Sequence, residues 1–106
     1  YHTGDVDDGA ETLMGTAFQN TSILVGDTLY VCTPRNRVVA LDPNTGAERW
    51  VFDSKVETDG MYIVTCRGVS HWLDDQVADG EPCREKIYMG TLDARMIAID
   101  AKTGSL

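Results

Sequence analysis

Basic residues, cysteines and long apolar runs are all scarce in this sequence, and each shortage excludes a class of protein. Only nine Lys and Arg stand against 17 Asp and Glu, which gives a formal net charge of −8. This balance argues against a nucleic-acid partner, because binding to phosphates needs clusters of basic side chains, and against adsorption on anionic lipid. No apolar run approaches the roughly 20 residues that a membrane-spanning helix needs.

Motifs for nucleotide or metal chemistry are also missing. The sequence has no Gly-rich phosphate loop and no nucleophile constellation. Three cysteines without CxxC spacing and only two His argue against a structural zinc site. The acidic stretch Asp5–Gly9 lacks the spacing of a calcium loop, so we interpret it as a solvated loop. No metal ligand is therefore predicted in this chain.

The cysteines leave two interpretations open. Cys32, Cys66 and Cys83 are odd in number, so at least one is unpaired within a monomer. Cys66 and Cys83 could form a disulfide in an oxidising compartment. Alternatively, the cysteines could be small buried hydrophobic side chains.

The length and composition indicate a folded domain or part of one. The chain has 106 residues, of which 42% are hydrophobic, so a disordered segment is not expected. It begins at Tyr1 with no initiator Met and no signal peptide, which suggests a piece of a longer protein.

An internal repeat organises the sequence. The peptide "ALDPNTGAERW" at 40–50 returns as "AIDAKTGSL" at 98–106, an offset of 58 residues, and the similarity extends well before both peptides. Identical pairs are Tyr30/Tyr88, Thr33/Thr91, Arg37/Arg95, Ala40/Ala98, Asp42/Asp100, Thr45/Thr103 and Gly46/Gly104. Ungapped similarity of this length indicates two copies of one supersecondary unit.

Each unit reads as β-structure. The first copy contains four short runs of strand-forming residues, "SILV", "TLYVCT", "RVVAL" and "ERWVF", separated by turn chemistry. In "DPNTG", Asp42 can accept backbone N–H groups, Pro43 presets φ and Gly46 permits a positive φ. Four antiparallel strands, repeated, are typical of a propeller blade, so the predicted fold is all-β. In the second copy, "MYIVTC" is the predicted first strand and "LDDQVADGEP" a loop.

The repeated motif resembles a known family. Ala40, Asp42, Thr45, Gly46 and Trp50 match AxDxxTGxxxW, which is similar to the tryptophan-docking motif of the pyrroloquinoline quinone (PQQ) dehydrogenases. The segments "VGDTLYVCTPRNRVVALDPNTGAERWVFD" and "TCRGVSHW" resemble the membrane-bound glucose, quinate and polyol dehydrogenases, and "YHTGD" resembles the strand before their first motif. The resemblance implies an eight-bladed propeller in which each tryptophan packs on the neighbouring blade's backbone and donates its N–H to a carbonyl.

The resemblance also divides the chain. Residues 1–20 are expected to be the end of a preceding blade and a linker, 21–53 a complete blade, and 54–106 an insertion loop and an incomplete next blade. By the repeat, the second tryptophan would lie two residues beyond Leu106. Since a propeller fragment exposes strand edges, we expect this one to self-associate.

Arg67 is the first candidate for contact with PQQ. In soluble members an Arg in an "NRG" turn pairs with a PQQ carboxylate, and "CRG" takes that place here. A guanidinium binds a carboxylate bidentately. The alternative is a surface Arg that balances Asp74 and Asp75.

The remaining candidates are His71, Trp72 and Gln19. The glucose dehydrogenases have "RGVSYH", whose His is placed over PQQ; here the order is "RGVSHW", so Trp72 stands at the His position and His71 at the Tyr position. Adjacent residues of a strand face opposite ways, so both cannot line one pocket. Gln19 takes the approximate position of a Glu that contacts PQQ in soluble members.

For the parent protein, the resemblance implies a PQQ-dependent enzyme that oxidises a sugar, polyol or cyclic alcohol such as glucose or quinate. It would act at the periplasmic side of a bacterial inner membrane and pass electrons to ubiquinone. The Ca²⁺ or Mg²⁺ ligands and the catalytic Asp would lie outside this chain, so no catalytic residue is predicted here and the fragment is expected to be inactive. The alternative is a non-enzymatic propeller scaffold for protein partners, since outer-membrane assembly lipoproteins also use the docking motif.

Overall fold

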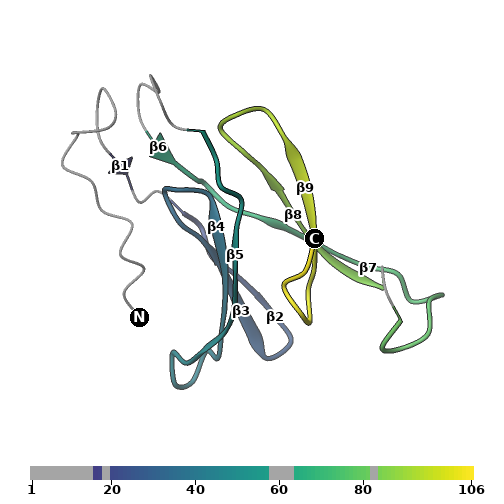
Figure 1. The fold of residues 1–106 in the computed structure, drawn as a ribbon. Helices are drawn as coiled ribbons and strands as arrows, with labels where there is room; N and C mark the ends of the chain where they lie inside the picture. Colours follow the sequence, from purple (N-terminus) through teal and green to yellow (C-terminus); the bar gives the residue numbers. More distant parts are fainter. Residues whose placement is uncertain (1–15, 18–19, 58–63, 82–83) are drawn as a thin grey trace.

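The first repeat forms a four-stranded antiparallel sheet (Figure 1). The computed structural model describes residues 16–17, 20–57, 64–81 and 84–106. Strands β2 (Ile23–Val25), β3 (Thr28–Cys32), β4 (Arg37–Leu41) and β5 (Glu48–Asp53) follow one another in chain order across the sheet. The four predicted strands and the all-β class are therefore confirmed. In the described ranges no helix has the length and apolar character to cross a membrane.

The second repeat forms a three-stranded sheet with the same register. It consists of β7 (Ser70–Leu73), β8 (Glu85–Gly90) and β9 (Met96–Asp100). Tyr30 faces Ala40 across β3 and β4, and Tyr88 faces Ala98 across β8 and β9. The repeat in sequence is thus a repeat in hydrogen-bond register.

The turns repeat as closely as the strands. Asp42 Oδ1 accepts the backbone N–H groups of Asn44 and Thr45, and the second copy of the turn bonds in the same way through the Asp at position 100. Gly46 has φ +73° and Gly104 has φ +75°. The predicted turn chemistry is confirmed: the aspartates satisfy backbone donors, and glycine occupies the left-handed position without a Cβ penalty.

The first strand of the second sheet lies later than the sequence predicted. "MYIVTC" was expected there, and its part outside the described residues is 61–63. The described part forms β6 (Val64–Thr65), which pairs in parallel with β1 (Thr16–Ala17) rather than with β8. β7 is the strand that pairs with β8. The expectation was wrong because contacts with the first sheet, described below, hold residues 64–68 away from β8.

The core lies between unlike faces of the two sheets. From the first sheet it takes Tyr30, Cys32, Val38 and Ala40; from the second it takes Ile87, Met89, Ile97 and Ile99. At the offset of 58, these second-sheet positions correspond to 29, 31, 39 and 41, which lie on the other face of the first sheet. The contact is therefore head-to-tail, the kind that closes into a ring when repeated with a suitable rotation.

The outward face of the second sheet is left open by this arrangement. Val38 is fully buried, whereas Met96, its counterpart in the repeat, is 75% exposed. The two positions have the same place in their sheets, so the difference reflects only what covers them. A further blade packed as the second packs on the first would bury Met96. Parts of the expected preceding blade fall in residues 1–15 and 18–19, outside the described residues, and the division at 20/21 and 53/54 stays a prediction.

Candidate functional site

Trp50 on β5 joins the two sheets. Its Nε1 donates a hydrogen bond to the carbonyl oxygen of Ala101 at 3.1 Å. The Tyr30 hydroxyl donates to the same oxygen at 3.2 Å, and the two aromatic ring centroids lie 5.9 Å apart. Ala101 belongs to the turn motif of the second sheet. The structural role expected for Trp50, a ring on the neighbouring blade's backbone with its N–H on a carbonyl, is therefore confirmed.

Gly104 lies directly under the Trp50 ring. A Cβ added to Gly104 would stand 2.7 Å from Trp50 Cδ2 and 2.7 Å from Cε3, closer than such atoms approach. The motif glycine thus serves twice, because its positive φ makes the turn and its missing side chain makes room for the indole. Gly46, its counterpart in the first sheet, has nothing within 4 Å of the same position.

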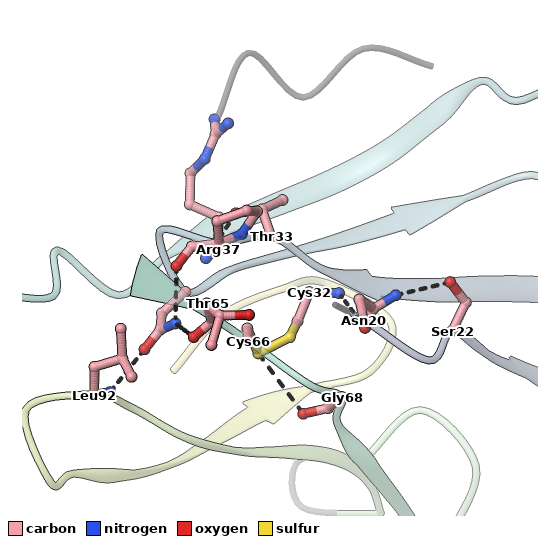
Figure 2. Close-up of a disulfide and its surroundings, with 11 residues drawn as sticks. Asn20, Ser22, Cys32, Thr33, Arg37, Thr65, Cys66, Gly68 and Leu92 are labelled. Atoms are coloured by element: carbon pink, nitrogen blue, oxygen red, sulfur yellow. Dashed lines mark hydrogen bonds between the residues drawn. A yellow bond between two sulfur atoms is a disulfide. The ribbon is translucent and has the colours of Figure 1, made fainter. Parts of the chain in front are cut away.

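A disulfide fixes the segment that carries Arg67. Cys66 is bonded to Cys32 at the end of β3, with the Cα atoms 5.9 Å apart (Figure 2). Both residues are buried. Of the two interpretations left open by the sequence, a Cys66–Cys83 disulfide is wrong, because Cys66 pairs with Cys32; Cys83 lies outside the described residues. The separation of 34 residues along the chain gave no sequence signal for this pairing.

Two hydrogen bonds hold the same turn, residues 65–68, on either side of the disulfide. The Asn36 side chain donates from Nδ2 to the carbonyl oxygen of Thr65 at 3.1 Å. The backbone N–H of Thr21 donates to the carbonyl oxygen of Arg67 at 2.8 Å. The backbone of Arg67 is therefore fixed from both directions along the chain.

Asn36 connects this turn to the second sheet as well. It is 1% exposed, and its φ of 56° lies in the left-handed region that Asn tolerates better than most residues. Its Nδ2 also donates to the Pro34 carbonyl at 3.3 Å, while its Oδ1 accepts the backbone N–H of Leu92 at 2.8 Å. One buried amide thus joins the β3–β4 turn, the Arg67 turn and the β8–β9 turn.

The Arg67 side chain itself is exposed. Among residues 20–57, 64–81 and 84–106, no hydrogen bond or ion pair engages its guanidinium. Asp74 and Asp75, the alternative partners, do not pair with it in that part of the chain. A rigid backbone under an unengaged guanidinium is an arrangement suited to an anionic ligand, because little ordering entropy remains to be lost on binding.

His71 and Trp72 lie on opposite faces of β7. His71 faces Ile87 across the ladder, and its Nε2 lies 2.7 Å from Oε1 of Glu85. Both partners of this contact are mostly buried. Trp72 faces Lys86 on the other side and is 48% exposed. His71 is thus engaged within the chain, whereas Trp72 points to the face that a further blade would cover.

The long acidic loop lies at the far end of β7 from Arg67. Residues 74–84 connect β7 to β8, while Arg67 precedes β7, so the strand separates them (Figure 1). Asp79 ties this loop to the second copy of the turn motif by an ion pair with Lys102 Nζ at 2.8 Å. The loop therefore belongs to the end that holds the Trp50 contact and does not line the Arg67 turn.

Asp93 and Arg95, in the β8–β9 turn, connect this turn to the segment after β5 at the end of the molecule that carries Arg67. Their side chains form an ion pair at 2.9 Å, and Arg95 Nη2 donates to the Ser54 carbonyl at 2.8 Å. The Arg95 guanidinium, with the Thr91 hydroxyl, holds the pKa of the Asp93 carboxyl well below its usual range. The β8–β9 turn thereby fixes the chain just after β5.

The residues present fit one carboxylate of a planar polycarboxylate ligand. Arg67 offers the cation and the fork geometry that a carboxylate requires. Trp72 offers an exposed aromatic face, though on a surface that the described chain leaves uncovered. Gln19 lies outside the described residues. PQQ, when bound, supplies an ortho-quinone that accepts two electrons from an alcohol.

Sequence reasoning missed two of the residues that hold the Arg67 turn, Cys32 and Asn36. Both lie in the first repeat, far in sequence from residues 65–68, and neither is part of the docking motif. The one available signal was in the repeat itself: positions 32 and 36 carry Cys and Asn, while positions 90 and 94 carry Gly and Ala. Cys32 and Asn36 contact the Arg67 turn, and their counterparts Gly90 and Ala94 differ from them in residue type.

Comparison with known proteins gives a consistent result across the whole chain. The family model named PQQ, which describes the β-propeller domain of glucose, ethanol and alcohol dehydrogenases, matches residues 1–106. The chain is 40% identical over 107 residues to a glycerol dehydrogenase large subunit of Gluconobacter oxydans (strain 621H), covering 100% of this chain and 14% of that protein. It is 43% identical over 91 residues to a quinoprotein glucose dehydrogenase of Escherichia coli (strain K12), covering 81% and 11%.

A solved structure shows the same likeness in three dimensions. The crystal structure of a quinohemoprotein alcohol dehydrogenase from Comamonas testosteroni superposes with a TM-score of 0.65 at 26% identity, covering 95% of this chain and 13% of that one. The chain therefore spans only about a seventh of the length of the proteins it matches.

Proposed function

Because the chain belongs to the PQQ family of dehydrogenase β-propellers, we propose that its parent protein is a PQQ-dependent dehydrogenase that oxidises a polyol, sugar or cyclic alcohol. Glycerol, glucose and quinate are the substrates to compare first. In this proposal the chain contributes part of the PQQ site, and the metal ligands and the catalytic base come from other blades.

The observation that carries the proposal is the Arg67 turn. Its backbone is anchored by a disulfide and by hydrogen bonds from Asn36 and Thr21, yet its guanidinium is exposed. A scaffold that binds protein partners has no need for a cation held in this way. In an enzyme, the same geometry presents a fork of N–H donors to a carboxylate of PQQ.

The disulfide also supports the proposed location. Disulfides form and persist in oxidising compartments such as the bacterial periplasm. A buried Cys32–Cys66 bond fits a domain that faces the periplasm, from which electrons could pass to ubiquinone in the membrane.

The proposal is tested by measuring the Kd for PQQ of the full-length parent apoprotein in the presence of Ca²⁺ or Mg²⁺, with protein fluorescence as the signal. Arg67→Ala should raise the Kd for PQQ about 10-fold or more, and Arg67→Lys should recover part of the loss, since it keeps the charge but not the fork. Arg49→Ala is the control for the loss of one positive charge, since Arg49 lies on β5 at the opposite end of the sheet, where it pairs with Asp27 and Asp42. A parent that does not bind PQQ would favour the scaffold alternative.

Self-association is proposed for the isolated chain. The exposed Met96 lies on the face that a further blade would cover, and edge strands offer unpaired backbone groups. Light scattering of the 106-residue chain should show dimers or larger species, and Met96→Lys should shift the distribution toward monomer. A monodisperse monomer for the unmodified chain would contradict this expectation.

A further inference from the structure

We propose that the Cys32–Cys66 disulfide is a positioning element for Arg67 and sets the affinity of the parent protein for PQQ. This inference rests on the proposed function of Arg67. It assigns to two buried cysteines, one at the end of β3 and one directly before Arg67, a role at a ligand that neither of them touches.

The disulfide is the covalent anchor of the Arg67 turn. Cys66 directly precedes Arg67 in the chain, so a change in the position of Cys66 moves the Arg67 backbone with it. The remaining anchors of the turn, at Thr65 and at the Arg67 carbonyl, are single hydrogen bonds. Single hydrogen bonds open locally at low cost, whereas the covalent bond does not.

The other half of the disulfide is itself fixed. Cys32 is fully buried at the end of β3, where it faces Val38 in the ladder. Its backbone N–H donates to Asn20 Oδ1 at 3.2 Å, and the Asn20 amide donates to the Ser22 hydroxyl at 2.8 Å (Figure 2). The bond therefore transmits the rigidity of the four-stranded sheet to the turn.

The repeat provides an internal comparison. The counterpart of Cys32 in the second sheet is Gly90, which is exposed and forms no covalent link. The strand and turn geometry around Cys32 and Gly90 is the same, with register preserved from one sheet to the other. The blade fold thus does not require a cysteine at this position. The role of Cys32 therefore lies in its bond to Cys66, next to Arg67.

The physical effect is preorganisation. A guanidinium whose backbone is already in place loses less freedom when it binds a carboxylate, so removal of the anchor weakens binding without removal of any contact. Replacement of residues that orient metal ligands commonly costs about 10-fold to 100-fold in metal affinity, and we use the lower end of that range for a group that orients a cation. We expect an increase of about 10-fold in the Kd for PQQ.

The test uses the full-length parent apoprotein with Cys32→Val and Cys66→Ala together, which keeps the buried site apolar. The Kd for PQQ is measured by fluorescence with Ca²⁺ present, in the Arg67 and Arg67→Ala backgrounds. The matched control is Ile99→Val, a substitution at a fully buried position of β9. It should lower the melting temperature and leaves the disulfide and the hydrogen bonds of the turn in place.

The expected result is a Kd about 10-fold higher than that of Ile99→Val in the Arg67 background, and no further increase in the Arg67→Ala background. The Michaelis constant for the alcohol at saturating PQQ should not change, because only cofactor affinity depends on the turn. A Kd equal to that of the control, or the same increase in both backgrounds, overturns the inference. If Arg67→Ala alone leaves the Kd unchanged, the proposed function fails first, and this inference with it.

A second measurement tests the inference even if the double cysteine variant does not fold. The unmodified apoprotein is reduced with a phosphine, its thiols are alkylated and the reagents are removed before PQQ is added. A Kd raised about 10-fold, with the β-sheet circular dichroism retained, supports the inference. An unchanged Kd after complete modification of Cys32 and Cys66, verified by mass spectrometry, overturns it.

Discussion

The indole of Trp50 lies against the α-carbon of Gly104, so that no side chain other than hydrogen fits between the two sheets at this point. The two residues come from the same motif in successive copies. Trp50 is the last residue of the first motif, and Gly104 is the glycine of the second. The first motif therefore offers its ring and the second offers its bare turn. The same contact, repeated from blade to blade, would let a repeated peptide specify a ring of blades.

Replacement of Gly104 by Ala should destabilise the chain more than the same change at Gly26. Both glycines have positive φ, but only Gly104 would bring a Cβ against Trp50. We expect about 1 kcal/mol for Gly26→Ala from backbone strain, and about 1–3 kcal/mol more for Gly104→Ala from overpacking. Urea unfolding of the 106-residue chain measures both. Equal losses would mean that the ring contact contributes nothing.

Ala101 accepts hydrogen bonds from both Trp50 and Tyr30, and we expect the two to be coupled. Trp50→Phe and Tyr30→Phe each remove one donor and leave the other, so each should cost about 1 kcal/mol. The double variant leaves the Ala101 carbonyl without either donor, in a residue that is 4% exposed. In a double-mutant cycle, the double variant should lose about 1 kcal/mol more free energy of unfolding than the two single variants together. Strictly additive losses would contradict the idea that the two donors share one acceptor.

Tryptic mapping without reduction should find the disulfide between two specific peptides. Cys66 lies in the peptide 56–67, and Cys32 lies in the peptide that ends at Arg35. Mass spectrometry should detect these two peptides linked, and reduction should release them. A link between 56–67 and the peptide 68–84, which carries Cys83, would instead support the Cys66–Cys83 pairing that the sequence left open.

Stability should decline in acid, in part through Asp93. The pKa of Asp93 is lower in the folded state than its unfolded value, because of Arg95 and then the Thr91 hydroxyl. Its stabilising contribution is therefore present above pH about 4 and is lost as the pH falls below that value. Asp93→Asn should lower stability at pH 7 and flatten the acid limb of a pH series of urea midpoints.

The control for this series is Asp75→Asn. Asp75 is exposed and forms no hydrogen bond through its side chain in the described part of the chain. Its replacement should leave the acid limb as it is in the unmodified protein. An Asp93→Asn profile parallel to that of Asp75→Asn would show that the Arg95 contact does not contribute.

The sequence by itself determined the blade and its repetition. Alternating apolar residues, the Asp and Gly of each turn, and the offset of 58 act locally, through backbone preferences and side-chain alternation, so they can be read without knowledge of distant contacts. Trp50 and its docking role followed from the same motif. Arg67 was found as a candidate because its neighbours in sequence resemble a known turn.

Only the tertiary structure decided what holds that turn. Cys32 and Asn36 reach residues 65–68 across the chain. The described part of the predicted first strand pairs with β1, and β7 takes its place beside β8. The partners of Cys32 and Asn36 are set by how the two sheets pack, not by spacing along the chain. Such contacts leave no periodic signal, because a disulfide or a buried amide needs only that two distant segments meet.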